Sequence, residues 1–244
     1  MKETKKRAKS EKKSQGHSIR SLLASYDKSV KKLDLKGAAN MDVYNITAPF
    51  SSGSQTYIIG RAELRSFEVS SVAVFFRKKG SSWELCKDYP ALLLQDPFIT
   101  RLGEMIILGG VEVRQRSIAS GLSFRTVFYK GSSIRGLRRF SKGPWGMKGI
   151  RMVMLDHKHG NDIGVFTRPR GRKGGRGKIG FEVIDSLSKL TPRVLSNAKI
   201  LEGMFARGEW GGANEVHLLK KGKIGVLGHI AKFERDKEGK RIRY

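Results

Sequence analysis

Along most of the chain, apolar and polar positions alternate in short runs, as they do in β-strands. From about residue 41, runs rich in β-branched and aromatic residues are separated by turns of Gly, Ser, Asn and Lys-Gly. One earlier stretch has apolar residues at the spacing of a helix face: Ile19, Leu22, Leu23, Tyr26 and Val30. Residues 1–17 have the lysine-rich composition of a disordered tail. We therefore predict a disordered tail over 1–17, a helical segment in 18–40 and a β-domain over 41–244.

The strand pattern repeats. Four segments share one plan, a strand, a tight polar turn and a strand ending in glycine or a basic residue: 42–63, 95–113, 151–171 and 214–233. With Ile58, Ile107, Val165 and Val226 as equivalent points, the copies are 49, 58 and 61 residues apart, and further strand-like runs lie between them. A repeat of about 50 residues with about four strands has the size of a β-propeller blade. A β-sandwich, the alternative, needs no strict module.

The fourth copy ends close to Tyr244, which leaves no room for its outer strands or for a closing blade. An unclosed propeller would expose strand edges. Either the N-terminal segment closes the ring or the ring is incomplete at its C-terminal end. We expect the second.

The cysteine content and the apolar runs of the chain bear on its cellular compartment. The chain has 244 residues and one cysteine, Cys86, which cannot form an internal disulfide. No run approaches the roughly 20 apolar residues of a membrane span, and no apolar segment follows the N-terminal lysines as in a secretory signal. We expect a cytoplasmic protein that contacts no membrane.

The net charge of the chain indicates a class of binding partner. The chain has 49 basic and 22 acidic residues, a net charge of +27, of which residues 1–40 contribute only +8. A surface of this kind favours polyanions, phosphorylated ligands or anionic membrane. Alternatively, the net charge reflects a general bias of the composition toward lysine and indicates no particular partner.

Propeller sites lie where the inner strands converge, so polar residues on the repeated hairpins are the candidates. First strands offer Asp42, Asp96, Asn214 and Glu215. Second strands, or the residues just after them, offer Arg61, Glu112, Arg168, Arg170 and His229. Carboxylates mixed with Arg and His suit a polyhydroxylated ligand that bears phosphate, because Arg binds phosphate oxygens bidentately. We expect no cofactor and no metal.

Two stretches have both a structural and a functional interpretation. Asp96, directly before Pro97, is either a turn cap or an acid in the dry setting of neighbouring leucines. Around Trp210, the run EWGGANEVH is either a loop packed on the core or a sugar site built from an aromatic ring with Asn, Glu and His.

The run RPRGRKGGRGK, residues 168–178, alternates Arg and Gly as flexible RNA-binding segments do. It also fits a phosphate-binding loop. It connects two apolar strands and contains no aromatic residue, which argues against a free RNA-binding tail.

Several of these motifs occur together, in order, in a known group. VYNITAPF, LQDPFITR, GGVEV, GPWGMKGIR, GVFTRPRGRKGGRGKIGF, EWGGANEVHLL and IGVLGHIA resemble a bacterial and trypanosomatid family related to the β-mannoside phosphorylases. The resemblance covers about residues 18–244. It implies a five-bladed β-propeller with a central site. It also implies either reversible phosphorolysis of β-mannosides to mannose 1-phosphate or mannosyl transfer from an activated donor such as GDP-mannose.

The resemblance also implies roles for individual residues. Asp96 of the Asp-Pro motif would be the catalytic acid. Phosphate contacts would be Arg168, His229 and Arg151. Sugar or supporting contacts would be Glu112, Asn214, Glu215 and His217. The expected partners are a mannoside or mannose-phosphate substrate and inorganic phosphate.

One departure keeps alternatives open. The family pattern has an acid after Met-Lys in the GPWGMKGIR motif, where this chain has Gly149. A catalytically silent sugar-binding propeller, or a truncated inactive homologue, is therefore the alternative to an enzyme. A nucleic-acid-binding protein, suggested by the net charge, is the third hypothesis.

Overall fold

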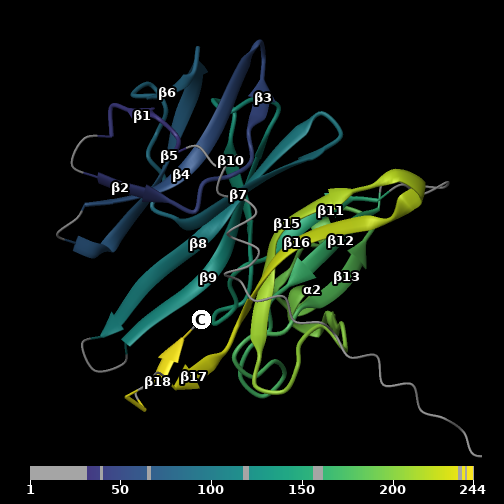
Figure 1. The fold of residues 1–244 in the computed structure, drawn as a ribbon. Helices are drawn as coiled ribbons and strands as arrows, with labels where there is room; N and C mark the ends of the chain where they lie inside the picture. Colours follow the sequence, from purple (N-terminus) through teal and green to yellow (C-terminus); the bar gives the residue numbers. More distant parts are fainter. Residues whose placement is uncertain are drawn as a thin grey trace, which may run out of the picture. The chain divides into compact units, whose positions relative to one another are not determined.

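The computed structural model describes residues 32–38, 41–64, 67–117, 121–155, 162–235, 238–239 and 241–243. The chain divides into two units, residues 1–34 and 35–244. The predicted tail and the predicted helical stretch up to residue 31 lie outside the described residues. The second unit is built almost entirely of strands (Figure 1), so the all-β prediction is confirmed. In its described part, the one α-helix is α2 (Pro192–Asn197), and η1 (Leu187–Lys189) and η2 (Lys220–Gly222) are short 3-10 turns.

The first sheet has six strands. Its order is β1-β6-β5-β4-β2, with β3 also paired to β4. All pairs are antiparallel except β1 with β6, which brings the sheet's first strand in before residue 41. The strands are β1 (Leu35–Lys36), β2 (Met41–Tyr44), β3 (Phe50–Ser52), β4 (Gln55–Leu64), β5 (Phe67–Lys79) and β6 (Ser82–Leu85).

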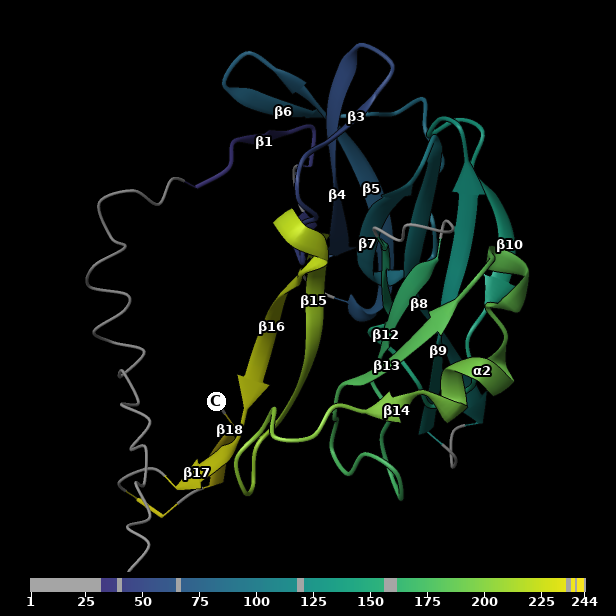
Figure 2. The ribbon, with the colours of Figure 1, turned by 90° about the vertical axis from the view of Figure 1, so that its right-hand side faces the viewer.

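The second and third sheets repeat one plan, four antiparallel strands in chain order. The second contains β7 (Gln95–Leu102), β8 (Met105–Ser117), β9 (Gly121–Gly131) and β10 (Arg138–Lys142). The third contains β11 (Arg151–Met154), β12 (Ile163–Thr167), β13 (Gly180–Ile184) and β14 (Lys199–Ile200). Both sheets are twisted, as Figure 2 shows for β7, β8 and β9.

The fourth sheet has two strands in the described part of the chain, β15 (Trp210–Leu218) and β16 (Ile224–Ala231). A separate hairpin follows, made of β17 (Phe233–Arg235) and β18 (Arg241–Arg243). All four predicted hairpins are confirmed, because β3 pairs with β4, β7 with β8, β11 with β12 and β15 with β16. The four equivalent apolar points lie on the second strand of each pair.

Apolar side chains are buried on both faces of the first two sheets. Successive residues of a strand point to opposite faces. Ile58 packs within one cluster and Ile59 within another, which it shares with Leu108 of the second sheet. Ile107, next to Leu108, packs instead against the third sheet in a cluster with Val165. Burial on both faces explains why these strands are continuous apolar runs.

Successive sheets contact one another through their inner strands. β7 contacts β4 of the first sheet and β11 of the third, and β11 contacts β15 of the fourth. Residues far apart in sequence therefore come together, as Ala48 and Glu215 do across 167 positions. In the described part of the chain, no helix is long and apolar enough to cross a membrane.

Candidate active site

A pocket of about 780 Å³ lies where the first strands converge. Its wall is formed by the segment after β2, the start of β7, the segment before β11, and β15 with β16. Glu215 Oε1 accepts a hydrogen bond of 3.2 Å from Ala48 N, which joins the fourth sheet to the first. The polar ends of four sheets thus enclose one space.

The pocket collects most of the side chains that the sequence predicts for the site. Seven of the eight residues assigned through the resemblance line it: Asp96, Arg151, Arg168, Asn214, Glu215, His217 and His229. Arg61 and Arg170, candidates from the hairpin pattern, line it too. Asp42 and Glu112 do not.

Asp96 occupies an unusual backbone position. It has φ of +48°, and two residues of β7, Asp96 and Pro97, stand where β8 has one. Such a bulge re-aims a side chain out of the regular pleat, and a left-handed φ costs free energy that persists where the surroundings enforce it. The Asp96 side chain is 28% exposed and faces the pocket.

Two donors address one oxygen of Asp96. Asn45 Nδ2 donates to Oδ1 at 2.5 Å, and Arg61 Nη1 donates to the same Oδ1 at 3.2 Å. No described group donates to Oδ2 within hydrogen-bond distance. Oδ1 is thus held by two donors, and Oδ2 faces no donor among the described residues.

The Arg61 side chain is itself held in place by neighbouring side chains. Its Nε donates to Glu63 Oε1 at 2.8 Å and to Ser71 Oγ at 3.0 Å, and its guanidinium lies 5.0 Å from the centre of the Tyr44 ring. Glu63 is 5% exposed and also accepts hydrogen bonds from Tyr44 and Ser71. A buried carboxylate with these partners holds the arginine against Asp96.

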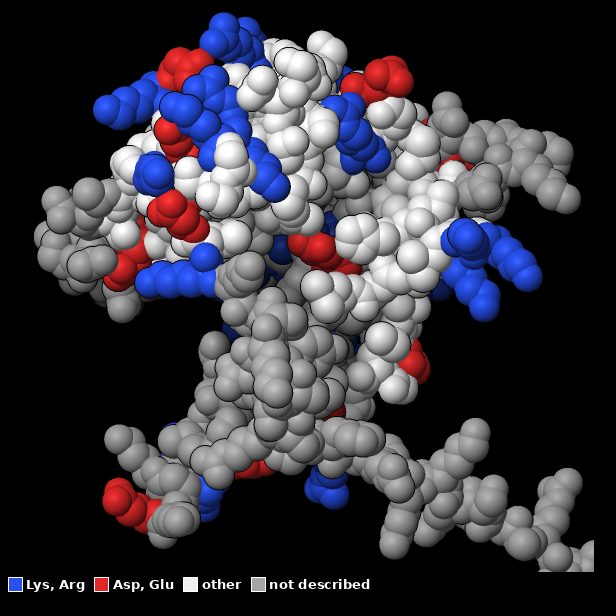
Figure 3. Space-filling model, turned by 45° about the horizontal axis from the view of Figure 1, so that its top comes forward, with Lys and Arg blue, Asp and Glu red and all other residues white. Residues whose placement is uncertain are grey.

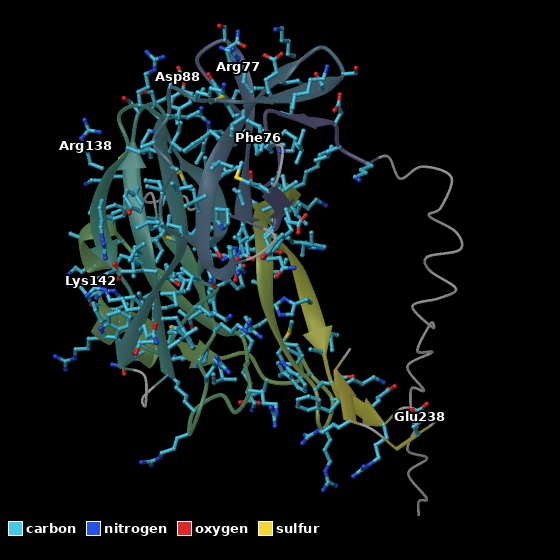
Figure 4. The ribbon with its side chains drawn as sticks, turned by 90° about the vertical axis from the view of Figure 1, so that its left-hand side faces the viewer. Phe76, Arg77, Asp88, Arg138, Lys142 and Glu238 are labelled. Atoms are coloured by element: carbon cyan, nitrogen blue, oxygen red, sulfur yellow. The ribbon has the colours of Figure 1, made fainter. Side chains whose placement is uncertain are left out.

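Positive charge dominates the pocket wall. Its basic residues are Arg61, Lys148, Arg151, Arg168, Arg170 and Arg176, against the carboxylates Asp96 and Glu215. Figure 4 shows that basic side chains also project elsewhere, for example Arg138 and Lys142 from the outer strand β10. The pocket differs from those outer positions because its cations converge on one space.

Arg151 lies beside the acid. Its guanidinium stacks 4.5 Å from the centre of the Phe98 ring, and its Nε donates to Asn214 O at 2.5 Å. Burial lowers the pKa of Arg151 to about 10, with Asp96 and Glu215 opposing the shift and Arg168 adding to it. The side chain remains a cation at neutral pH.

Arg168 reaches the pocket over two glycines. Its Nε donates to Gly211 O at 2.6 Å. A Cβ at Gly212 would lie 2.8 Å from Arg168 Cδ and 3.4 Å from His229 Cε1. The Gly-Gly pair of EWGGANEV therefore leaves the space that the guanidinium occupies.

Lys148 completes the inner group of cations. Its ammonium lies 5.5 Å from the centre of the Phe124 ring. Burial lowers the pKa of Lys148; Asp96 opposes this shift, and the nearby Arg168, Arg170 and Arg61 add to it. A lysine crowded by three arginines favours an anion between them.

The fourth sheet supplies the other polar groups. His229 Nδ1 and Asn214 Oδ1 are 2.8 Å apart, and His217 Nε2 lies 3.2 Å from Glu215 Oε2. A register shift between Ala213 and Glu215 turns this part of β15 toward the pocket. The predicted sugar contacts Asn214, Glu215 and His217 thus lie together, next to the arginines.

Glu112 has other partners. Arg125 Nε donates to its Oε2 at 2.6 Å, and Arg139 and Arg114 donate to Oε1 at 3.2 Å each. Burial would raise the pKa of Glu112, but the hydrogen bonds and charges of Arg139 and Arg125 lower it to about 2. The structure therefore puts Glu112 in an ion cluster on the second sheet.

Gly149 stands where the resemblance expects an acid. It lines the pocket with φ of +74°, and a Cβ there would lie 3.5 Å from Arg168 Cδ. The backbone conformation favours glycine. No carboxylate enters the pocket from this position.

Asn45 and Lys148 line the pocket but were not predicted from the sequence as site residues. Asn45 follows β2 and has φ of +50°. An asparagine in a turn is ordinary, and its contact with Asp96 spans 51 positions. Lys148 is one of 49 basic residues, and only its burial beside three arginines distinguishes it.

The model of a family described as "Protein of unknown function (DUF1861)" matches residues 24–244. The chain belongs to this family. No curated protein matches it.

Solved structures give a more specific likeness. A mannose phosphorylase from Leishmania mexicana, MPT-4, in complex with phosphate ion, is 30% identical with a TM-score of 0.79, over 92% of this chain and 70% of that chain. MPT-1, a GDP-Man-dependent mannosyltransferase from the same organism, is 31% identical with a TM-score of 0.77, over 93% and 71%. The resemblance predicted from the motifs is confirmed.

A more distant structure shares the fold. The β-1,2-mannobiose phosphorylase of Listeria innocua is 12% identical, with a TM-score of 0.54, over 88% of this chain and 73% of that chain. At this identity the likeness concerns the arrangement of strands alone.

Proposed function

We propose that this protein transfers mannosyl groups by inverting displacement at the anomeric carbon, with phosphate as nucleophile or as leaving group. The observation that carries the proposal is one aspartate, Asp96, set against a wall of cations in a single pocket. The likeness to a mannose phosphorylase and to a mannosyltransferase supports the choice of sugar.

The number of carboxylates supports phosphate over water. An inverting hydrolase needs an acid and a base, separated by roughly 6.5–9.5 Å to admit water. Glu215, the other carboxylate in the pocket wall, is engaged by Ala48 N and His217. Phosphate needs no base, because it is already an anionic nucleophile and requires only cations to hold it.

In phosphorolysis, an oxygen of phosphate attacks C1 of a β-mannoside while the C1–O bond to the aglycone breaks. Asp96 Oδ2 gives its proton to the departing oxygen, and mannose 1-phosphate forms with inverted configuration. Arg151, Arg168 and His229 hold the phosphate, and Lys148 adds a further cation. In the reverse direction, the acceptor hydroxyl attacks C1, Asp96 takes its proton and phosphate leaves. The same groups serve transfer from a sugar-phosphate donor.

The sugar would lie between Asp96 and the polar end of β15. Asn214, Glu215 and His217 offer acceptors and donors for hydroxyl groups there. We assign Glu112, in its ion cluster, a supporting role: it orders Arg125 and Arg139 on the second sheet.

We also propose that the four sheets are successive blades of a five-bladed β-propeller. The common strand order of the second and third sheets supports this, as does the contact between first strands. The proposed domain spans 41–244, with β1 added to its first blade, after the N-terminal segments 1–17 and 18–40.

A binding protein without turnover is the second candidate, and Gly149 is the observation that favours it. The pocket lacks an acid at this position, so a mannoside or mannose 1-phosphate would bind without reacting. Nucleic acid fits less well. In the Arg/Gly run, Lys173 is engaged within the fold, where it donates to Ser196 O and Ala198 O at 2.7 Å. Figure 3 also shows acidic groups beside the basic ones on one face.

The test is incubation with mannose 1-phosphate or GDP-mannose plus mannose, with detection of oligosaccharide and of released phosphate or GDP. Asp96→Asn should abolish turnover and leave the melting temperature nearly unchanged. Asp42→Asn is the matched control, since Asp42 lies on a first strand outside the pocket. Full activity of Asp96→Asn would overturn the role of Asp96, and ligand binding without turnover in the unaltered protein would favour the binding protein.

A further inference from the structure

The pocket carries more positive charge than one phosphate needs. Six basic residues and two carboxylates line it. Lys148 and Arg151 lie close enough to Asp96 and Arg168 for those two charges to affect their pKa values. The inner cations Lys148, Arg151 and Arg168, with His229, suffice for a phosphate dianion. Arg61 is paired with Glu63 and Asp96, which leaves Arg170 and Arg176, both exposed.

Neither outer arginine forms an ion pair with any described carboxylate within 4.0 Å. Each guanidinium instead lies on aromatic rings. Arg170 is 5.4 Å from the centre of Phe124, and Arg176 is 4.5 Å from Phe233 and 5.4 Å from Trp210. A guanidinium on a ring keeps its N–H edge available for an anion in the plane of the group.

The segment that carries both arginines is pinned to the fold. Gly171 and Gly175 exchange backbone hydrogen bonds of 2.8 and 2.7 Å, and Gly211 N donates to Gly177 O at 3.1 Å. Lys178 N donates to Pro169 O at 3.2 Å, which closes the segment at its base. Cations on a fixed loop lose little entropy when they bind.

The two arginines continue the inner group toward the rim. Arg170 is near enough to Lys148 to lower the pKa of that lysine. Arg176 lies against the rings of Trp210 and Phe233, which also line the pocket. Gly171 and Gly175 pair in antiparallel fashion, so Arg170 and Arg176 are neighbours across the turn.

We propose that Arg170 and Arg176 form a subsite for a second phosphoryl group, beyond the one held by Arg151 and Arg168. The subsite rests on the proposed function, because it extends the same pocket. Its ligand is either the outer phosphate of a nucleoside diphosphate sugar or the phosphate of a phosphorylated acceptor sugar. The two sources share one chemistry, a phosphoryl group at the rim.

Calorimetric titration of the full chain distinguishes the sources. The ligands are inorganic phosphate, pyrophosphate, GDP, and a hexose 6-phosphate in saturating phosphate. Arg176→Gln should weaken binding of pyrophosphate and GDP by ~10-fold or more, the value of a charge-assisted contact, and of phosphate less than ~2-fold. Arg172→Gln removes the same charge from the same loop outside the pocket and should change neither. Arg176→Lys, which keeps the charge, guards against a folding defect and should lose less than Arg176→Gln.

Selective loss for pyrophosphate and GDP supports a diphosphate donor. Selective loss for the hexose 6-phosphate alone supports a phosphorylated acceptor. Equal loss for all ligands, inorganic phosphate included, or no loss for any, overturns the subsite. Binding needs no turnover, so an inactive protein that still shows the selective loss contradicts the proposed function and leaves the subsite standing. An active protein without the selective loss supports the proposed function and overturns the subsite.

Discussion

Asn45 and Asp96 face each other with the same left-handed backbone, at φ of +50° and +48°, and are joined by a hydrogen bond of 2.5 Å from Asn45 Nδ2 to Asp96 Oδ1. One lies after β2 of the first sheet and the other in the bulge of β7. Asn and Asp tolerate this backbone better than other side chains do. Since Arg61 donates to the same oxygen, both donors hold Oδ1 and neither holds Oδ2.

The first prediction concerns Asn45. Asn45→Gly keeps a residue that tolerates positive φ but removes the amide, so Asp96 loses one of two donors and gains rotational freedom. A hydrogen bond to a charged group is worth about 1.5–3 kcal/mol, so we expect kcat to fall by ~10-fold or more. KM for the phosphate donor should change little, since the cations are untouched. Steady-state kinetics and the melting temperature measure both effects.

Asn45→Asp is the companion variant. It keeps the backbone preference but places a second carboxylate against Asp96 Oδ1, where a donor stood. Activity should fall below that of Asn45→Gly. If both variants turn over at the rate of the unaltered protein, Asn45 does not position Asp96.

The second prediction concerns Gly212, whose missing side chain makes room for Arg168. In Gly212→Ala, the new Cβ would lie 2.8 Å from Arg168 Cδ and 3.1 Å from Arg168 Nε. The far end of a long side chain can move, so the fold should persist while the guanidinium shifts. We expect the Kd for inorganic phosphate to rise ~10-fold or more, as for loss of a charge-assisted contact. Calorimetry gives the Kd.

Gly136→Ala is the control for this variant. A Cβ at Gly136 would meet Ser133 Oγ at 3.4 Å, in an exposed turn outside the pocket. Phosphate affinity should be unchanged there. Equal loss in both variants would show that alanine acts through stability and not through Arg168.

Asn45 and Asp96 illustrate how much of the site could be predicted from the sequence. The strands and the four hairpins were predictable, because turn residues mark where each strand ends. The pattern around Asp96 left a turn cap and an acid both open, and the motif resemblance was needed to predict that it belongs to the site. Asn45 was not identified as a site residue, because its role arises only when the first sheet contacts the second. Glu112 was grouped with the sugar contacts, but strand register pairs it with Arg125, and register cannot be deduced from an isolated Glu-Val-Arg run.

The third prediction concerns the pH dependence of anion binding. Burial and the charges of three arginines lower the pKa of Lys148. A lysine with a lowered pKa loses its proton at a lower pH than an exposed one, so its share of anion binding is lost as pH rises through that lowered value. Sulfate keeps a constant charge over this range and is the suitable probe. Its affinity should fall in the alkaline range before exposed lysines titrate.

Lys148→Arg isolates this effect. An arginine at this position stays protonated below about pH 10, where Arg151 begins to titrate, so below that pH the decline in sulfate affinity should disappear. Lys142→Gln, on the outer strand β10, should keep it. A decline of the same size in Lys148→Arg would assign the titration to another group.

The fourth prediction concerns acid stability and Glu112. The arginines lower its pKa from 4.5 to about 2 in the folded protein, although burial alone would raise it. A carboxyl with a lowered folded pKa contributes stability that is present above pH 4.5 and is lost as pH falls toward 2. The contribution is at most roughly 3 kcal/mol, from 1.36 kcal/mol per pKa unit.

Glu112→Gln should be less stable than the unaltered protein at pH 7, and the difference should shrink as pH falls from 5 to 2.5. Denaturant unfolding at each pH measures it, with Glu104→Gln as the exposed control. A difference independent of pH would mean that Glu112 stabilises the second sheet by packing and not by its charge.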